Sequence, residues 1–134
     1  MADTSYVDDP SIADKAPLWR RIPPWHFVYD DNLGRVRPSR AAFENHPDGT
    51  PMSVALGEDV LNAGRTAESV IAGNESFGLV SFPAGLARAK DQGVMRKPTA
   101  EEPAHAEVFG KKTGSVKKAI AKECEWVVAP PAPT

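Results

Sequence analysis

The stretch GKKTGSVKKAIAKEC, residues 110–124, carries the clearest secondary-structure pattern in the chain. Its apolar side chains recur at i, i+3, i+4 and i+8, the spacing of one face of an α-helix, and they are Val116, Ala119, Ile120 and Cys124. The lysines after Val116 lie off this stripe. The pattern therefore predicts an amphipathic helix that packs its apolar face against a core and leaves its lysine-bearing start in water.

Strands are predicted on both sides of this helix. Residues 104–109 alternate in polarity, and residues 126–128 form a last short strand. Residues 77–82 (FGLVSF) form a nearly continuous apolar run, which is typical of a central strand that is buried on both faces. The other expected elements are strands over 18–22, 25–29 and 52–56, short helices within 38–43, 58–73 and 84–92, and a charged loop over 96–103.

This order of elements predicts the α+β class, with a single domain, a mixed or mainly antiparallel sheet and short helices packed on one face. A doubly wound parallel fold is not expected, because parallel strands need longer helical connections than this chain offers. Residues 1–16 are expected to form an acidic N-terminal arm, residues 17–128 the domain and residues 129–134 a proline-rich tail. Both termini are expected to be disordered or extended.

Charge and composition exclude several classes of partner. The 134 residues carry 16 basic and 18 acidic side chains, so no overall positive field favours nucleic acid or an acidic membrane surface. The longest uncharged stretch, residues 76–87, is shorter than the roughly 20 apolar residues that span a bilayer. Cys124 is the single cysteine, and the first residues lack the pattern of a secretion signal. We therefore expect a cytoplasmic protein without a membrane partner.

The start of the predicted C-terminal helix is the best candidate for a phosphate-binding site. Lys111, Lys112, Thr113 and Ser115 lie where free backbone N–H groups and the helix dipole favour an anion. The segment is not a Walker A loop, because that pattern requires a lysine directly after its second glycine. The alternative is that Thr113 or Ser115 caps the helix and the lysines are solvated surface residues.

A second basic segment, RVRPSR (residues 35–40), is a candidate for holding a carboxylate or a phosphate. Side chains two residues apart on a strand point the same way, so Arg35 and Arg37 are expected to form a fork, with Ser39 beside them. The alternative is an exposed strand edge that its charge keeps soluble. A nucleic-acid contact through this segment is the least expected function.

Candidate acid–base residues are His26, His105 and Glu107. Imidazole titrates nearest neutrality, and Glu107 lies two residues after His105 on the same strand face. The alternative is that each histidine is partly buried and hydrogen-bonded within the fold. His46 lies in the turn sequence NHPDG and is interpreted as a turn residue.

Several enzyme classes are disfavoured because their motifs are incomplete. His105-Ala106-Glu107 matches the first half of the zinc deaminase pattern, but the P-C-x-x-C half is missing. Neither a metal-binding spacing nor the G-x-S-x-G of serine hydrolases is present, so we expect no metal and no cofactor. Cys124 lies on the apolar helix face and is expected to be a buried, inert thiol.

The first expectation for function is a small binding or accessory module that contacts a larger protein or a second copy of itself. It predicts an exposed apolar patch that contains a tryptophan. The alternative is an enzyme or ligand-binding domain for a phosphorylated small molecule or nucleotide. This alternative requires His105, Glu107 and Lys111 to line one cavity together with His26, Arg35 or Arg37.

Overall fold

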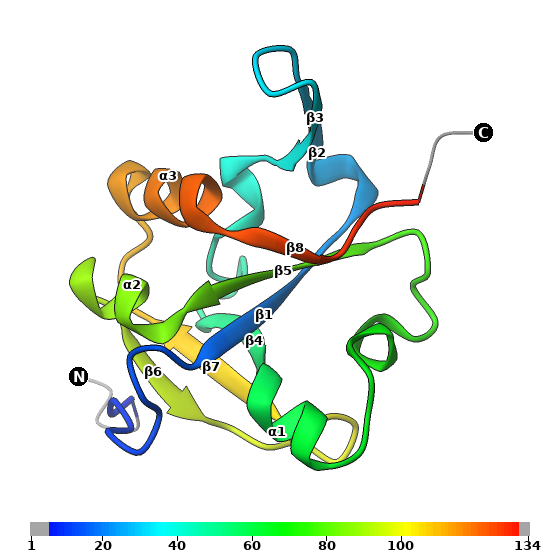
Figure 1. Cartoon of the computed structure of the whole chain (residues 1–134). Coiled ribbons are helices and arrows are strands. Elements are labelled where there is room, and N and C mark those ends of the chain that lie inside the picture. Colours follow the sequence, from blue (N-terminus) through cyan, green and yellow to red (C-terminus); the bar gives the residue numbers. More distant parts are fainter. Residues whose placement is uncertain (1–5, 132–134) are drawn as a thin grey trace.

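The strand β1 (Pro17–Ile22) lies inside the main sheet, between β4 (Met52–Leu56) and β5 (Gly78–Pro83). The computed structural model describes residues 6–131 and places six strands in the order β6-β7-β4-β1-β5-β8 (Figure 1). Each strand runs antiparallel to its neighbours, which confirms the predicted α+β class with a mainly antiparallel sheet. The remaining strands of this sheet are β6 (Gly93–Arg96), β7 (His105–Phe109) and β8 (Glu125–Val128).

The strand β5 explains why residues 77–82 are almost entirely apolar. Val80 and Phe82 are buried in the larger core on one face of the sheet, whereas Leu79 is buried in the smaller core on the other face. A strand that is covered on both faces cannot alternate between apolar and polar residues. The prediction of a central strand here is therefore confirmed.

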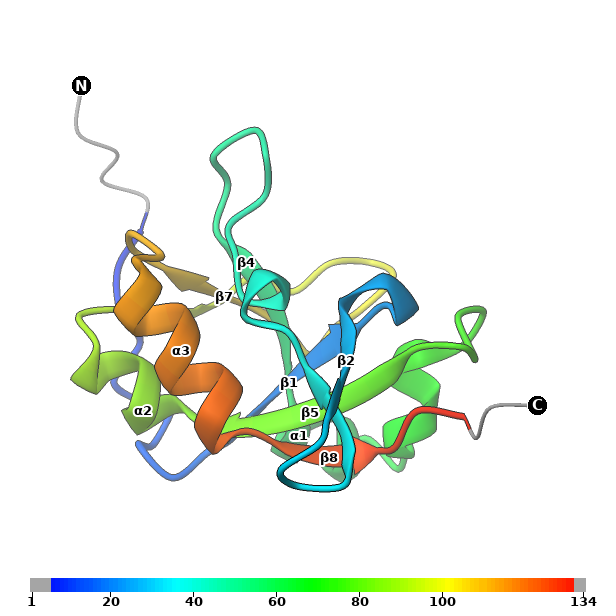
Figure 2. The same cartoon turned by 90° about the horizontal axis from the view of Figure 1, so that it is seen from above.

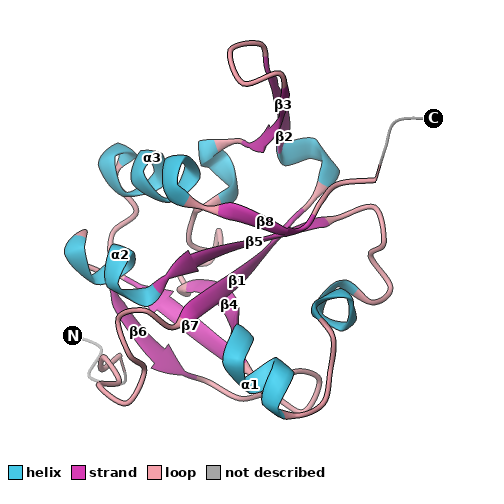
Figure 3. Ribbon diagram, viewed as in Figure 1, coloured by secondary structure: helices cyan, strands magenta, loops and turns pink. Residues whose placement is uncertain are grey.

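Helices cover both faces of the sheet. The two helices α2 (Ala84–Ala89) and α3 (Gly114–Glu123) lie side by side on the face of the larger core (Figure 2). The other face carries α1 (Gly57–Asn62) and η3 (Ala67–Ile71), a 3-10 helix (Figure 3). The expectation of helices on one face therefore holds for α2 and α3 but not for α1 and η3. The physical reason is that Val60 of α1 and Ile71 of η3 are needed to bury the apolar second face of the sheet.

The amphipathic pattern of residues 110–124 is confirmed in α3. Val116 and Ile120 are buried against the larger core, and Cys124 packs at its margin. Thr113 is the N-cap, and its side-chain oxygen accepts a hydrogen bond from the Val116 N–H group at 3.4 Å. Of the two capping candidates, Thr113 is therefore the residue used.

The strands β2 (Phe27–Asp30) and β3 (Arg35–Pro38) form a separate hairpin that projects from the main body (Figure 1). The prediction of one strand over residues 25–29 is wrong at its start, because Trp25 and His26 belong to η1 (Pro24–His26), a 3-10 helix. Pro24 fixes the backbone angle φ of the first helical position, which favours a turn there. The indole N–H of Trp126 donates to the carbonyl of Val36 at 3.1 Å and fastens the hairpin to β8.

The strand β6 is a further correction, because the sequence analysis predicted a helix within residues 84–92, a loop from residue 96 and no strand between them. The strand pairs with β7 from Gly93 opposite Phe109 to Arg96 opposite Ala106. The ring of Phe109 occupies the space that a side chain at position 93 would need, which explains the glycine. A pairing of this kind depends on a distant segment, so local sequence does not reveal it.

The described part of the predicted N-terminal arm, residues 6–16, lies on the domain and contributes to its core. Ile12 is only 2% exposed, and Ala16 is also buried. The carboxylate of Asp8 accepts hydrogen bonds from Arg88 at 3.0 Å and from the Val94 N–H at 2.9 Å. Residues 1–5 of that arm and residues 132–134 of the predicted tail lie outside the described residues. No helix within residues 6–131 is long and apolar enough to cross a membrane.

Candidate functional site

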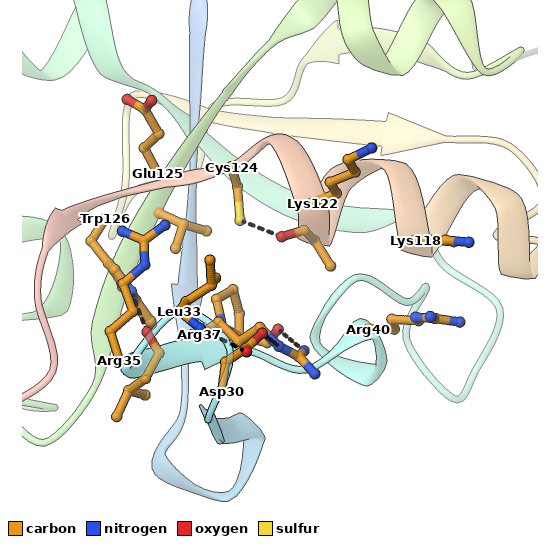
Figure 4. A pocket seen from close by; sticks show the side chains of 14 residues that line it. Asp30, Leu33, Arg35, Arg37, Arg40, Lys118, Lys122, Cys124, Glu125 and Trp126 are labelled. Carbon is orange, nitrogen blue, oxygen red and sulfur yellow. Dashed lines mark hydrogen bonds and ion pairs between the residues drawn. The ribbon is translucent and has the colours of Figure 1, made fainter.

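A groove of about 270 Å³ lies between the β2–β3 hairpin, α3 and the start of β8 (Figure 4). We call it the basic groove because five basic side chains line it against two carboxylates. The basic residues are Arg35, Arg37, Arg40, Lys118 and Lys122, and the carboxylates are those of Asp30 and Glu125. The structure therefore brings the predicted pair of arginines together with lysines from a different part of the chain.

Local backbone geometry places these side chains on one groove. Arg35 and Arg37 are two residues apart on β3, where alternate side chains share a face. Lys118 and Lys122 are four residues apart on α3, so they lie one turn apart on the same side of the helix. The sequence analysis recognised these lysines only as residues off the apolar stripe, because their proximity to β3 is a tertiary contact.

Most of the positive charge in the basic groove has no carboxylate partner. Within residues 6–131, Arg37 is the one basic residue of the groove that forms an ion pair, from its Nε to Asp30 Oδ2 at 2.9 Å. Hydrogen bonds from the N–H groups of Leu33 and Asn32 and from Arg37 lower the pKa of Asp30, so this carboxylate is ionised at neutral pH. The other four basic side chains are exposed to solvent. The groove is therefore available to an external anion.

The floor of the basic groove is apolar. Leu33, Cys124 and Trp126 line it between the charged side chains (Figure 4). Burial raises the pKa of Cys124 to about 12, and its Sγ donates to the carbonyl of Ala121 at 3.6 Å. The cysteine is thus a neutral thiol in this groove at physiological pH.

Large apolar side chains are exposed on the segment that leads into the hairpin turn. Trp25 is 75% exposed, and Tyr29 and Leu33 are also mainly exposed. All three belong to the segment that runs from η1 through β2 to the hairpin turn. Leu33 lines the basic groove, whereas the Trp25 ring contacts that of Phe77, which does not. Exposed apolar side chains of this kind are typical of surfaces that bind other proteins.

The predicted anion site at the start of α3 has its central groups engaged inside the fold. Lys112 is 6% exposed, and its ammonium donates to Asn45 Oδ1 at 2.8 Å, to the Val108 carbonyl at 2.9 Å and to the Gly110 carbonyl at 3.0 Å. Burial lowers the pKa of this lysine to about 8. Lys111 and Ser115 are exposed. Lys112 therefore connects the loop before β4 to the end of β7, whereas Lys111 points to solvent.

Ser39 also has a local role. Its side-chain oxygen accepts a hydrogen bond from the Ala41 N–H at 3.0 Å and so caps η2 (Arg40–Ala42), a 3-10 helix. Ser39 does not line the basic groove, although Arg37 and Arg40 on either side of it do.

The candidate acid–base residues do not share a cavity with the basic groove. His105 lines a second cavity, where its Nδ1 is 2.8 Å from the Lys97 carbonyl oxygen, and Glu107 lies two residues further along β7. His26 lies in η1, and its buried Nδ1 has no hydrogen-bond partner within residues 6–131. Burial, with a smaller effect of Arg20, lowers the pKa of His26. The common cavity that the enzyme hypothesis requires is therefore not formed.

The second cavity, of about 610 Å³, contains groups that the sequence analysis did not select. His46, predicted as a turn residue, lies with its Nε2 3.0 Å from Ser53 Oγ at this cavity. Arg20 and Arg65 also line it. The available signal was Arg20, a charged residue between buried residues of one strand, but that signal alone does not locate a cavity.

Neither protein-family models nor comparisons with curated proteins and solved structures gave a match to this chain. Within residues 6–131, no group of three or more histidine, cysteine or acidic side chains is arranged to hold a metal ion. The function of this chain is therefore inferred from its own geometry.

Proposed function

We propose that the protein is a small binding module that holds an acidic segment of a protein partner in the basic groove. The observation that carries the proposal is the gathering of four basic side chains without carboxylate partners, Arg35, Arg40, Lys118 and Lys122, around an apolar floor. Arginine and lysine side chains that meet a carboxylate form charge-assisted hydrogen bonds, which are about twice as strong as neutral ones.

The groove suits a peptide better than a compact ion. Its basic side chains come from β3, η2 and α3, so they are distributed along the groove and do not converge on one point (Figure 4). Leu33 and Trp126 between them offer contact to apolar side chains of the same segment. The partner chemistry is therefore an extended sequence that alternates acidic and apolar residues.

Binding of a short fluorescent peptide rich in glutamate and leucine tests this proposal by fluorescence anisotropy. The double variant Lys118→Glu/Lys122→Glu should weaken binding by about tenfold or more, because it replaces attraction by repulsion on one side of the groove. The charge-matched control is Lys97→Glu/Lys111→Glu, which changes two exposed lysines outside the groove.

The control variant distinguishes binding in the basic groove from a general attraction between the acidic peptide and the basic side chains of the surface. We expect the control variant to bind within about twofold of the wild type, since the rest of the surface contributes only a screened field. Equal weakening in both double variants would mean that the peptide has no defined site. A second copy of the chain is the other expected partner, and sedimentation equilibrium of the protein alone detects it.

A second candidate function is the binding or conversion of a phosphorylated small molecule or nucleotide. The start of α3 does not favour it, since Lys112 and Thr113 are engaged within the fold.

A further inference from the structure

The second cavity opens where two neighbouring strands of the sheet separate. The strands β1 and β4 are paired at two positions only, Leu18 with Leu56 and Trp19 with Ala55. Beyond Trp19, β1 stays paired with β5 as far as Ile22. Over the same length β4 stays paired with β7. The two strands therefore diverge, and we call the cavity between them the crevice.

The size of the crevice is that of a small-molecule site. Its volume of about 610 Å³ lies within the range of roughly 300–1,000 Å³ that is common for ligand pockets. Arg20 and Arg21 of β1 and Ser53 of β4 line it. Arg20 reaches across the gap between the two strands, where its Nη1 donates to the Ser53 carbonyl. Arg20 and Arg21 are adjacent on β1, so their side chains leave the strand on opposite sides, and both nonetheless line the cavity.

Arg20 is a half-buried cation without a compensating carboxylate. Its Nε donates to the carbonyl of Ala42 at 3.1 Å, and its Nη1 donates to the carbonyl of Ser53 at 2.8 Å. Within residues 6–131, no ion pair involves Arg20 and its Nη2 has no hydrogen-bond partner. Two carbonyl groups thus hold the guanidinium in place and leave one of its two terminal NH₂ groups for an external acceptor.

The positive charge of Arg20 acts on the groups around it. Burial, and then the neighbouring charge of Arg21, lower the pKa of Arg20 to about 10. The charge of Arg20 in turn contributes to the lowered pKa values of His26 and Lys112. An anion in the crevice would relieve this repulsion, because an opposite charge at short range stabilises each cationic form.

The other polar groups of the crevice add hydrogen-bond donors. Ser53 Oγ and His46 Nε2 lie 3.0 Å apart at the cavity, and Arg21, which is exposed, also lines it. Arg65 is bound by both carboxylate oxygens of Glu102, at 2.6 Å and 2.9 Å. This ion pair neutralises Arg65, and Glu101 adds one further carboxylate to the lining, so the positive charge of the crevice lies on Arg20 and Arg21 of β1.

Two aromatic side chains supply an apolar wall. Trp19 and Phe77 both line the crevice, and Trp19 is packed tightly against Gly57, where a side chain would not fit. The indole is therefore held in one orientation. A flat apolar group that enters the crevice meets a fixed aromatic surface.

We propose that the crevice binds an organic phosphate with a flat ring system, with its phosphoryl group at Arg20, Arg21 and Ser53 and its ring against Trp19 and Phe77. This site shares no residue with the basic groove, so it is independent of the function proposed above. The two sites would bind different kinds of ligand. The basic groove would bind an extended acidic segment, and the crevice would bind a compact phosphate ester.

NMR titration of the full-length, ¹⁵N-labelled protein tests this inference, with adenosine monophosphate as the probe. We expect saturable shifts of the backbone amides of β1 and β4 around Arg20 and Ser53. Inorganic phosphate and adenosine, added separately, should each bind at least about tenfold more weakly than the monophosphate, because each makes only part of the contacts. Shifts that do not saturate, or that are confined to the basic groove, would overturn the proposal.

Two mild substitutions assign the site. Arg21→Gln removes an exposed cation and Ser53→Ala removes a hydroxyl while it keeps the carbonyl that holds Arg20, so both variants should fold. Each should weaken binding of adenosine monophosphate by about fivefold or more, which is the loss of one charged or hydroxyl contact. Arg35→Gln, in the basic groove, should leave it unchanged. Wild-type binding by both crevice variants would exclude the crevice as the site.

Discussion

Cys124 shows how packing determines the chemistry of one side chain. The thiol lies on the apolar floor of the basic groove, and burial raises its pKa from 9.0 to about 12. We predict that iodoacetamide alkylates Cys124 in the folded protein about a thousandfold more slowly than in the urea-unfolded chain at the same pH, because the thiolate is the reactive form. Mass spectrometry over time measures both rates. Similar rates in the two states would show that the thiol is ionised in the folded protein.

The buried side chain of Lys112 should make the free energy of unfolding depend on pH, and its pKa shift determines the direction. Its pKa falls from 10.5 in the unfolded chain to about 8 in the fold, so the unfolded chain binds more protons between these values. Stability should therefore rise with pH across this window, by about 1–3 kcal/mol relative to the variant Lys112→Met. Urea unfolding at several pH values measures the difference.

The matched control for this prediction is Lys111→Met, because Lys111 is exposed and next in sequence. This variant should keep the same rise in stability as the wild type. A rise that persists in Lys112→Met would assign the pH dependence to another group.

Single residues also mark the limit of prediction from sequence. The sequence offered Thr113 and Ser115 as caps, of which the structure uses Thr113, and it placed Cys124 on the apolar helix face, where the thiol is half-buried. It could not tell which of the adjacent lysines Lys111 and Lys112 turns inward. That choice depends on Asn45, which lies 67 residues away from Lys112 in sequence.

At the scale of elements, the start of α3 offers a test of capping. Thr113→Ala removes the side-chain oxygen that accepts from the Val116 N–H and should lower the free energy of unfolding by about 1 kcal/mol. Ser115→Ala changes an exposed residue within the first turn and should shift stability by less than about 0.5 kcal/mol. Thermal and urea unfolding of both variants compare them. An equal loss in the two variants would mean that the Thr113 cap contributes no more to stability than the exposed Ser115 side chain does.

Elements with a strong local pattern were predictable, and elements defined by distant contacts were not. The helix α3 and the strand β5 each carry a pattern in their own residues, either an apolar stripe or an apolar run. The strand β6 has four residues and exists because β7 pairs with it. The turn η1 replaced the start of a predicted strand, because two successive prolines constrain the backbone more strongly than the alternation of side chains does.

At the scale of the whole molecule, the N-terminal segment is part of the stability of the domain. Ile12 is buried in the larger core although it precedes the first strand. We predict that Ile12→Ala lowers the free energy of unfolding by about 2–4 kcal/mol, because it leaves a cavity in that core. The control Val7→Ala, at a position 66% exposed in the same segment, should change it by less than about 0.5 kcal/mol. A negligible loss of unfolding free energy in Ile12→Ala would mean that the N-terminal segment does not stabilise the domain.

The two candidate sites were predictable to different degrees. Arg35 and Arg37 were selected because they are neighbours in sequence and share a strand face. The addition of Lys118 and Lys122 requires the docking of α3 beside the hairpin, which no local pattern states. The crevice is harder still to predict from sequence. It results from the separation of β1 and β4, which lie more than thirty residues apart along the chain.

The strand order across the sheet also constrains how the chain reaches its fold. Among the described elements, β1 precedes in sequence the strands that it pairs with, β4 and β5, and residues 6–16 precede the residues of α2 and β6 that they contact. Contacts between such distant segments slow folding to roughly milliseconds or seconds, since each closes a long loop. During synthesis, the apolar residues of β1 therefore lack their full set of partners until β5 (Gly78–Pro83) has been made, and a chaperone would protect the chain most during this interval.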